Sequence, residues 1–274
     1  MQAALSRLKA SGQTSSRRSA RGRAIAAQVA TVTVADVARD IPTVPFADVA
    51  FAVDSDSVVP GERDETMARV LNIAIAAIAL VVLSPLILLI ALAIKLTSRG
   101  PVFYSQIRVG VDRRWRYSRR FDRRTYDHGG QLFTMYKFRT MHINAEPDGR
   151  AVWATRSDPR VTLVGRILRR TRLDELPQLW NVLRGEMNVV GPRPERPSIF
   201  AELRRTIPEY PLRQRVKPGI TGWAQVNLPY DACTDDVRRK VQFDLEYVRR
   251  QSLVEDLRIM SMTLPVMMFR KGAH

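Results

Sequence analysis

The longest hydrophobic stretch of the chain is a run of 25 residues without a charged side chain, between Arg69 and Lys95. As a straight helix it would be about 37 Å long, enough to cross the hydrocarbon core of a bilayer. A helix buried in a soluble protein is rarely apolar on every face over such a length, so the run predicts membrane insertion. Near its middle, Ser84-Pro85 predicts a kink, because proline removes a backbone hydrogen bond and its ring clashes with the preceding turn.

The kink leaves two arrangements of this segment open. One is a kinked transmembrane helix, and the other is a re-entrant helix-break-helix that enters and leaves the membrane by the same face. Basic residues flank both ends of the run (Arg63, Arg69, Lys95, Arg99 and Arg108), so the positive-inside rule gives no orientation. The residues alone fit both arrangements equally.

The second pattern lies in the segment 165–185. Apolar residues recur there at the i, i+3, i+4, i+7 spacing of an amphipathic helix: Leu176, Leu179, Trp180 and Leu183. We expect this helix to end at Gly185, with Asp174 as its N-cap and Pro177 in its first turn.

Two further patterns are shorter. The sequence YKFRTM, residues 136–141, alternates Lys137 and Arg139 with Phe138, which predicts a strand carrying both charges on one face. The stretch 253–269 is mainly apolar with a few charges. A helix packed on the rest of the domain and a helix at the membrane interface fit this stretch equally.

Composition and charge narrow the classes of protein. A chain of 274 residues with a single cysteine, Cys233, cannot form an internal disulfide, and 45% hydrophobic residues argue against a wholly disordered chain. The formal net charge of +17 predicts an anionic partner. Residues 1–35 carry +6 and residues 36–66 carry −6, so all of the excess lies in residues 67–274. The first 66 residues hold no lasting periodicity, which predicts a mobile N-terminal tail.

A basic insert occupies residues 112–124, where arginines alternate with Trp115, Tyr117 and Phe121. Arginines mixed with aromatic residues can contact single-stranded nucleic acid. Beside a membrane segment they favour a patch for anionic lipid headgroups, and a plain solvated loop also fits. The membrane segment removes a freely soluble nucleic-acid binder from consideration, and we expect no nucleic-acid partner.

Candidate chemistry centres on Asp174 and Glu175. An Asp-Glu pair at a helix start is usually only a cap, but a cluster of arginines precedes this one: Arg166, Arg169, Arg170 and Arg172. A helix N-terminus already favours anions. Carboxylates among arginines suit a phosphate or metal–phosphate site.

Other segments add candidate phosphate contacts. Arg193 lies between two prolines in GPRPE, which present it with little conformational freedom, or form only a stiff turn. Lys217 and Gln225 belong to VKPGITGWAQVN, residues 216–227, whose glycines allow close approach of a ligand, or only a tight turn. The sequence contains no G-x-x-x-x-G-K-[ST], H-E-x-x-H or G-x-S-x-G motif.

From about Met67 to Ala273 the chain resembles the bacterial sugar transferase family, monotopic phosphoglycosyl transferases that act on polyprenyl phosphate. The resemblance is carried by Ser84-Pro85, YKFRTM, DPRVTLVGRILRRTRLDELPQLWNVLRGEMNVVGPRPE, VKPGITGWAQVN and DLEYV…SLVEDLRIM. It implies a helix-rich α+β fold with a small β element. The implied organisation is a tail over residues 1–66, a re-entrant membrane helix broken at Ser-Pro over 67–98, and a catalytic domain over 99–274.

The resemblance also implies a reaction. A sugar-1-phosphate would pass from a UDP-sugar to polyprenyl (undecaprenyl) phosphate with release of UMP, starting exopolysaccharide, capsule or O-antigen-type glycans. Asp174 would be the nucleophile and Mg²⁺ ligand, and Glu175 its dyad partner. We expect the helix dipole and arginines to keep Asp174 ionised. The expected phosphate or substrate contacts are Lys137, Arg139, Arg169, Arg172, Arg193, Lys217 and Gln225.

The resemblance places the protein at the bacterial inner membrane with its active site on the cytoplasmic face, beside anionic lipids. Downstream glycosyltransferases and a second copy of the chain are further candidate partners. Many members follow WAQVN with glycine and arginine, whereas this chain has Leu228-Pro229, so Arg238 or Arg239 is expected to compensate. The VNLPY form and the terminal FRKGA resemble an exopolysaccharide-associated branch.

A different class also fits part of the pattern. A catalytically silent membrane adaptor could bind nucleotide-sugars or assembly partners. The intact Asp174-Glu175 pair argues against it, because a silent copy would be free to lose both carboxylates.

Overall fold

The computed structural model describes residues 44–45, 58–114, 126–143, 145, 158–228 and 234–268. All of them belong to the second of two units of the chain, residues 42–274. The predicted mobile tail lies outside the described residues except for 44–45 and 58–66, and most of the basic insert 112–124 lies outside them as well.

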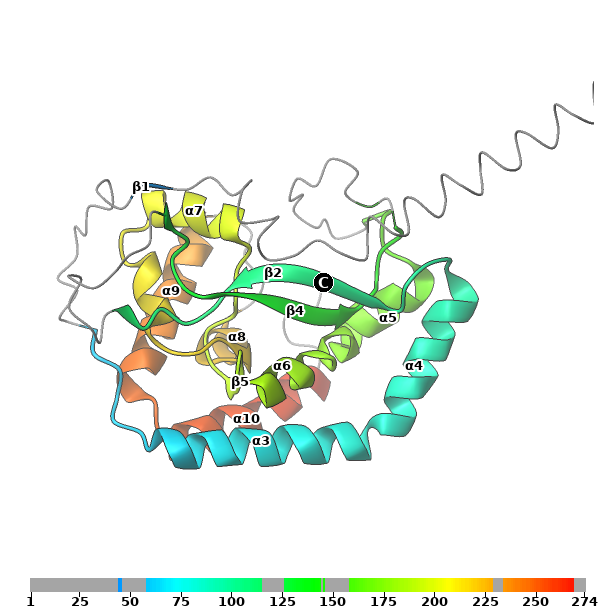
Figure 1. The fold of residues 1–274 in the computed structure, drawn as a ribbon, viewed down its shortest axis with the longest axis horizontal. Helices are drawn as coiled ribbons and strands as arrows, with labels where there is room; N and C mark the ends of the chain where they lie inside the picture. The colour runs from blue at the N-terminus through cyan, green and yellow to red at the C-terminus, as the bar shows by residue number, and fades with distance from the viewer. Residues whose placement is uncertain are drawn as a thin grey trace, which may run out of the picture. The chain divides into compact units, whose positions relative to one another are not determined.

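The described residues form a helix-rich α+β arrangement, as predicted (Figure 1). Its helices are α3 (Glu65–Val82), α4 (Ser84–Thr97), α5 (Leu163–Thr171), α6 (Gln178–Arg184), α7 (Pro197–Thr206), α8 (Trp223–Asn227), α9 (Thr234–Arg250) and α10 (Leu253–Met268), with the 3₁₀ turns η5 (Leu173–Glu175) and η6 (Tyr210–Arg215). Its strands are β1 (Val44–Pro45), β2 (Phe103–Val109), β3 (Tyr126–Asp127), β4 (Leu132–Phe138), β5 (Asn188–Val190) and β6 (Gly219–Thr221).

The β element consists of three two-stranded pairs within the described residues. The longest is the antiparallel pair of β2 and β4, in which Tyr104 lies opposite Lys137. Strands β5 and β6 pair in parallel, and β1 pairs antiparallel with β3. The strand predicted over residues 136–141 is confirmed as far as Phe138, where β4 ends, and its partner β2 is the strand that follows α4.

The uncharged run forms two helices that meet at Leu83, where α3 ends and α4 begins with Pro85 in its first turn (Figure 1). The predicted break at Ser84-Pro85 is thus present. Among the described helices, α3 is long and apolar enough to cross a membrane, and α4 is a shorter apolar helix.

One face of α3 packs against the rest of the unit. Ala68, Asn72 and Ala76, four residues apart, are buried on that face. The Asn72 amide donates to the carbonyl of Ala68 and accepts from the backbone N–H of Val189 at 2.6 Å, so a polar side chain fixes α3 against β5. The opposite face exposes large apolar side chains, including Val70 and Ile78.

Three hydrophobic clusters set the position of the β2–β4 pair. One joins α3, β4 and α6 through Ala76, Phe133 and Val182. The second joins α4 to the end of β4 and to α5. The third and largest contains residues of β5, α7, η6, α9 and α10. Residues 136–141 thus lie between two helices of the membrane segment and the helices that follow in the chain.

A buried ion pair joins the start of α3 to α10. The Arg63 guanidinium lies 3.0 Å from the Asp256 carboxylate, and both side chains are almost fully buried. We expect Arg63→Met to lower the free energy of unfolding by about 3–5 kcal/mol, because it leaves Asp256 buried without its cation. Thermal unfolding in detergent measures this. Arg250→Met is the control, since it removes an exposed pair with Glu246 and is expected to cost less than about 1 kcal/mol.

Candidate active site

Asp174 and Glu175 lie in the turn between α5 and α6. Helix α5 starts at a Thr162 cap, whose hydroxyl accepts from the N–H of Gly165, and ends at Arg172, which has a left-handed backbone (φ 56°). The 3₁₀ turn η5 follows and carries both carboxylates. Because the chain reverses at Arg172, the two acidic side chains are held on a short turn rather than in a helix.

The predicted helix of segment 165–185 is partly confirmed. Helix α6 ends at Gly185 as expected, but it begins at Gln178 with Pro177 as its N-cap residue. Asp174 is therefore not an N-cap. Among the apolar residues of that pattern Trp180 is 53% exposed, whereas Val182, which lies outside the pattern, is buried.

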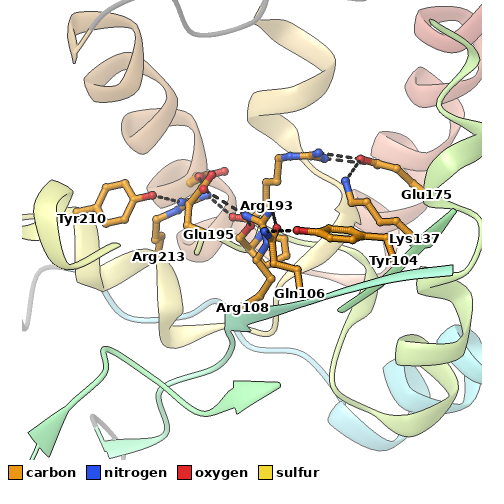
Figure 2. Close-up of polar contacts among 11 residues, drawn as sticks. Tyr104, Gln106, Arg108, Lys137, Glu175, Arg193, Glu195, Tyr210 and Arg213 are labelled. Atoms are coloured by element: carbon orange, nitrogen blue, oxygen red, sulfur yellow. Dashed lines mark hydrogen bonds and ion pairs between the residues drawn. The ribbon is translucent and has the colours of Figure 1, made fainter. Parts of the chain in front are cut away.

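Glu175 lies between two cations, which come from different elements (Figure 2). The Lys137 ammonium on β4 donates to Glu175 Oε1 at 2.8 Å. The Arg193 guanidinium donates to Oε1 at 2.7 Å and to Oε2 at 3.4 Å. Burial opposes ionisation of Glu175, but these two cations outweigh it and hold its pKa far below the usual value.

Asp174 has a different environment. Its side chain is 8% exposed, and its carboxylate makes no hydrogen bond or salt bridge with the described residues. Burial raises the pKa of Asp174, and the neighbouring Glu175 carboxylate adds to the rise. The charges of Lys137, Arg193 and Arg169 oppose the rise but do not outweigh it, so the pKa shifts in the direction opposite to that expected from the arginines and a helix dipole. The pair thus consists of one strongly bonded carboxylate and one that is free of hydrogen bonds within the described chain.

The other predicted contacts are distributed over three places. Arg169 lies close enough to influence Asp174, and its Nε donates to the Thr140 hydroxyl at 2.9 Å. Arg172 forms the turn before the dyad. Lys217 lies near Arg69, and its pKa is lowered by burial and then by that neighbouring charge.

Gln225 binds the carbonyl of Ile220 on the other side of its own loop. Arg238 and Arg239, the expected replacements for the missing arginine, are exposed on α9. In the described residues neither Lys217 nor Gln225 contacts the dyad.

Arg139 is placed at the end of the membrane segment. Its guanidinium donates to the carbonyls of Arg99 and Ser98 at 2.6 and 2.9 Å, and to the Ser98 hydroxyl at 2.7 Å. These acceptors follow the C-terminus of α4, where a cation also complements the helix dipole. Arg139 is buried there and comes one residue after β4 ends.

We expect Arg139→Met to act on stability more than on donor binding. Three hydrogen bonds and a dipole contact are lost at the end of α4, so the melting temperature is expected to fall by several degrees. The KM for the donor in the folded fraction is expected to change less than about threefold. A tenfold rise in KM with an unchanged melting temperature would instead make Arg139 a phosphate contact, as the sequence predicted.

Asn181 is a site-positioning residue that the sequence analysis did not single out. It is fully buried, accepts from the N–H of Tyr136 at 3.1 Å and donates to the carbonyl of Thr134 at 2.7 Å. These bonds fix α6 to β4, which places Lys137 beside the turn that follows α5. The sequence feature that could have identified Asn181 is its position inside a helical pattern that is mostly apolar.

The geometry and the sequence agree with a known family. The chain matches the model of the family described as "Bacterial sugar transferase" over residues 63–270, and it belongs to that family. It is 41% identical over 217 residues to an undecaprenyl-phosphate glucose phosphotransferase of Komagataeibacter xylinus, covering 77% of this chain and 38% of that one. It is 41% identical over 211 residues to a UDP-glucose:undecaprenyl-phosphate glucose-1-phosphate transferase of Escherichia coli, covering 76% and 41%.

A shorter relative is the exopolysaccharide production protein ExoY of Sinorhizobium fredii, 37% identical over 220 residues, covering 75% of this chain and 87% of that one. The resemblance to an exopolysaccharide-associated branch is consistent with this relative. The matched region spans only about two fifths of the length of the first two relatives.

Proposed function

We propose that this protein transfers a sugar-1-phosphate from a UDP-sugar to undecaprenyl phosphate, with release of UMP, at the start of polysaccharide assembly. The observation that carries the proposal is the unequal pair of carboxylates. Asp174 is buried and makes no hydrogen bond within the described residues, whereas Glu175 is bonded to Lys137 and Arg193. The names of the relatives supply the donor and acceptor classes.

In the first step an Asp174 carboxylate oxygen attacks the β-phosphorus of the donor. A P–O bond forms, the bond from that phosphorus to the bridging oxygen breaks, and UMP leaves with the bond's electron pair. In the second step a phosphate oxygen of undecaprenyl phosphate attacks the same phosphorus. The bond to Asp174 breaks, and the carboxylate is regenerated. Two displacements by oxygen nucleophiles therefore conserve atoms and charge.

The surrounding cations reduce the repulsion between the carboxylate and the diphosphate. The positive charges of Lys137, Arg193 and Arg169 each favour the ionised form of Asp174 and lower its pKa. Glu175 orients both Lys137 and Arg193, and its single negative charge neutralises only part of their combined positive charge. The remainder is available to the substrate phosphates. Fixed charges of this kind stabilise the developing negative charge in phosphoryl transfer.

The residues fit Mg²⁺ held jointly with the substrate. The described residues contain no cluster of three or more histidine, cysteine or acidic side chains. Mg²⁺ is commonly bound by one or two carboxylates together with substrate phosphates, and Asp174 has lone pairs that no hydrogen bond uses. Mg²⁺ bound there would neutralise charge on the diphosphate.

We further propose a monotopic placement at the inner membrane, with α3 and α4 inserted as a hairpin and the dyad on the cytoplasmic face. Nucleotide-sugars are water-soluble anions, so the carboxylates need access to the aqueous side. The acceptor phosphate is attached to a lipid, so the same site needs access to the membrane surface. Two apolar helices that break at Leu83 and bear exposed apolar faces support this placement.

The test is UMP release by detergent-solubilised, full-length protein from a panel of UDP-sugars, with undecaprenyl phosphate and Mg²⁺. Release that requires both lipid and a particular sugar is expected, and it would identify the donor among glucose, galactose and their N-acetylated forms. Binding of UDP-sugars without UMP release, in folded protein, would favour the adaptor function instead.

Removing divalent metal provides a separate prediction. With excess EDTA we expect UMP release to fall at least about a hundredfold, because the charge of the diphosphate is no longer offset. Adding Mg²⁺ in excess of the chelator is expected to restore the rate. Full activity after the protein has been dialysed against EDTA would contradict a metal-dependent reaction.

A further inference from the structure

The loop that carries Arg193 is fixed from outside. Four successive backbone carbonyls accept hydrogen bonds from other parts of the chain: Pro192 from Gly219 N–H at 3.0 Å, Arg193 from Arg213 Nη2 at 2.9 Å, Pro194 from Arg108 Nη1 at 3.0 Å, and Glu195 from Val109 N–H at 2.9 Å. Two of these residues are prolines, which have no N–H with which to form a regular element. The prolines limit the backbone angles, but the external donors determine where the loop lies.

The donor to the Arg193 carbonyl is itself held rigidly. The Arg213 side chain is 1% exposed, and its guanidinium lies 2.6 Å from the Asp244 carboxylate on α9. It also donates to the Tyr210 hydroxyl at 2.8 Å and lies over the Tyr210 ring, 5.0 Å from its centroid. Figure 2 shows Arg213 between Tyr210 and the Arg193 loop. Asp244 and Tyr210 are both buried, so they restrict the movement of the guanidinium.

Arg193 connects the buried Arg213 to the Asp174-Glu175 pair. The backbone carbonyl of Arg193 is bound by Arg213, and its guanidinium is bound to Glu175 (Figure 2). A shift of the carbonyl would move the guanidinium away from Glu175 as well. Misplacing a group near the reacting atoms by about 1 Å can cost about a hundredfold in rate.

We infer that Arg213 is a positioning residue for the transferase reaction, which acts by holding the Arg193 loop so that Arg193 contacts Glu175. The inference rests on the proposed function for its kinetic readout. Arg213 does not contact the dyad; among the described residues it contacts Tyr210, Asp244 and the Arg193 carbonyl. A guanidinium carries several N–H donors in a fixed fork, so Arg213 donates to both the Tyr210 hydroxyl and the Arg193 carbonyl while its charge pairs with Asp244.

A double-mutant cycle separates positioning from general stability. The variants are Arg213→Met, Arg193→Met and their combination, assayed for kcat and KM at a temperature where all are folded. We expect each single variant to lower kcat about 30- to 100-fold, and the double variant to be no slower than Arg193→Met. Losses that multiply in the double variant, or a folded Arg213→Met with the kcat of the unaltered protein, would overturn the inference.

The matched control is Arg204→Met. Arg204 is also buried and ion-paired, 3.1 Å from Asp127, but its contacts are with Asp127 and the Phe200 ring, not with a carbonyl of the Arg193 loop. Its loss is expected to lower the melting temperature with kcat reduced less than threefold. If Arg213→Met does not fold, the cycle is run with Arg213→Lys, which keeps the charge beside Asp244 but cannot reach all three acceptors.

A second readout does not depend on catalysis. Phenylglyoxal modifies accessible arginines, and peptide mass spectrometry measures the rate at Arg193, whose side chain is 22% exposed beside Glu175. We expect that rate to rise at least about fivefold in Arg213→Met and to stay unchanged in Arg204→Met. An unchanged rate in Arg213→Met would overturn the inference. Absence of UMP release in the unaltered protein would refute the proposed function while this readout still decides the role of Arg213.

Discussion

Asp174→Asn is expected to abolish UMP release, by about a thousandfold or more. The amide has nearly the volume of the carboxylate, and Asp174 makes no hydrogen bond within the described residues, so the substitution breaks no described contact. It removes the anionic oxygen that attacks phosphorus, and an amide is a poor nucleophile at neutral pH. Removing one of two adjacent buried carboxylates also relieves repulsion, so we expect the melting temperature to stay the same or rise.

The covalent step has its own measurement. Without the lipid acceptor, the unaltered protein is expected to gain the mass of one sugar phosphate, located by peptide mass spectrometry on the segment that contains Asp174. Asp174→Asn is expected to gain none. Asp235→Asn, at an exposed position on α9, serves as the control and is expected to retain both adduct and rate. An adduct in Asp174→Asn, or UMP release at the normal rate, would exclude Asp174 as the nucleophile.

The residues of the candidate site could be named from the sequence because most of them are concentrated in short segments. Asp174, Glu175 and Arg193 lie within 20 residues of one another, and their charge types alone indicate a phosphate site. Lys137 lies on β4, opposite Tyr104, and it contacts Glu175. The hydrophobic pattern predicted the break in the membrane segment for a similar reason, since proline acts on the backbone of its own turn.

The different hydrogen bonding of Asp174 and Glu175 could not be predicted from the sequence. Lys137 and Arg193 bond to Glu175 rather than Asp174, and the turn that carries both carboxylates follows Arg172, which has a left-handed backbone. Positive φ is uncommon in residues other than glycine, and no local sequence pattern predicts it at Arg172. After this turn α6 begins at Gln178, and Trp180 lies on its exposed face.

Long-range hydrogen bonds were also hidden from the sequence. Arg139 looked equivalent to Lys137 by alternation, yet it binds Ser98 and Arg99, about 40 residues earlier. Arg213 was one of many arginines in a basic chain, and its burial beside Asp244 follows only from the packing of η6 against α9. Periodicity predicts which face of an element is buried, but it does not identify the partner of a buried charge.

The ends of the membrane segment bear on its topology. Before α3, Arg63 is bonded to Asp256 of α10; after α4, Ser98 is bonded to Arg139, which follows β4. A helix that spans a bilayer would separate its two ends by about 30 Å and place them on opposite sides. The two contacts belong to one unit of the chain, so they could not both form if the bilayer lay between them. The proposed hairpin would keep both contacts, with α3 and α4 separated at Leu83.

Single cysteines at the two ends are therefore expected to be labelled from the same side of the membrane. Glu62→Cys and Arg99→Cys replace exposed side chains, and both are made with Cys233→Ser so that each protein has one thiol. In intact cells an impermeant maleimide is expected to label neither, and after permeabilisation it is expected to label both completely. A periplasmic protein with a free thiol shows that the reagent reached that compartment. Labelling of one position but not the other in intact cells would establish a spanning helix, and one of the two end contacts would have to break.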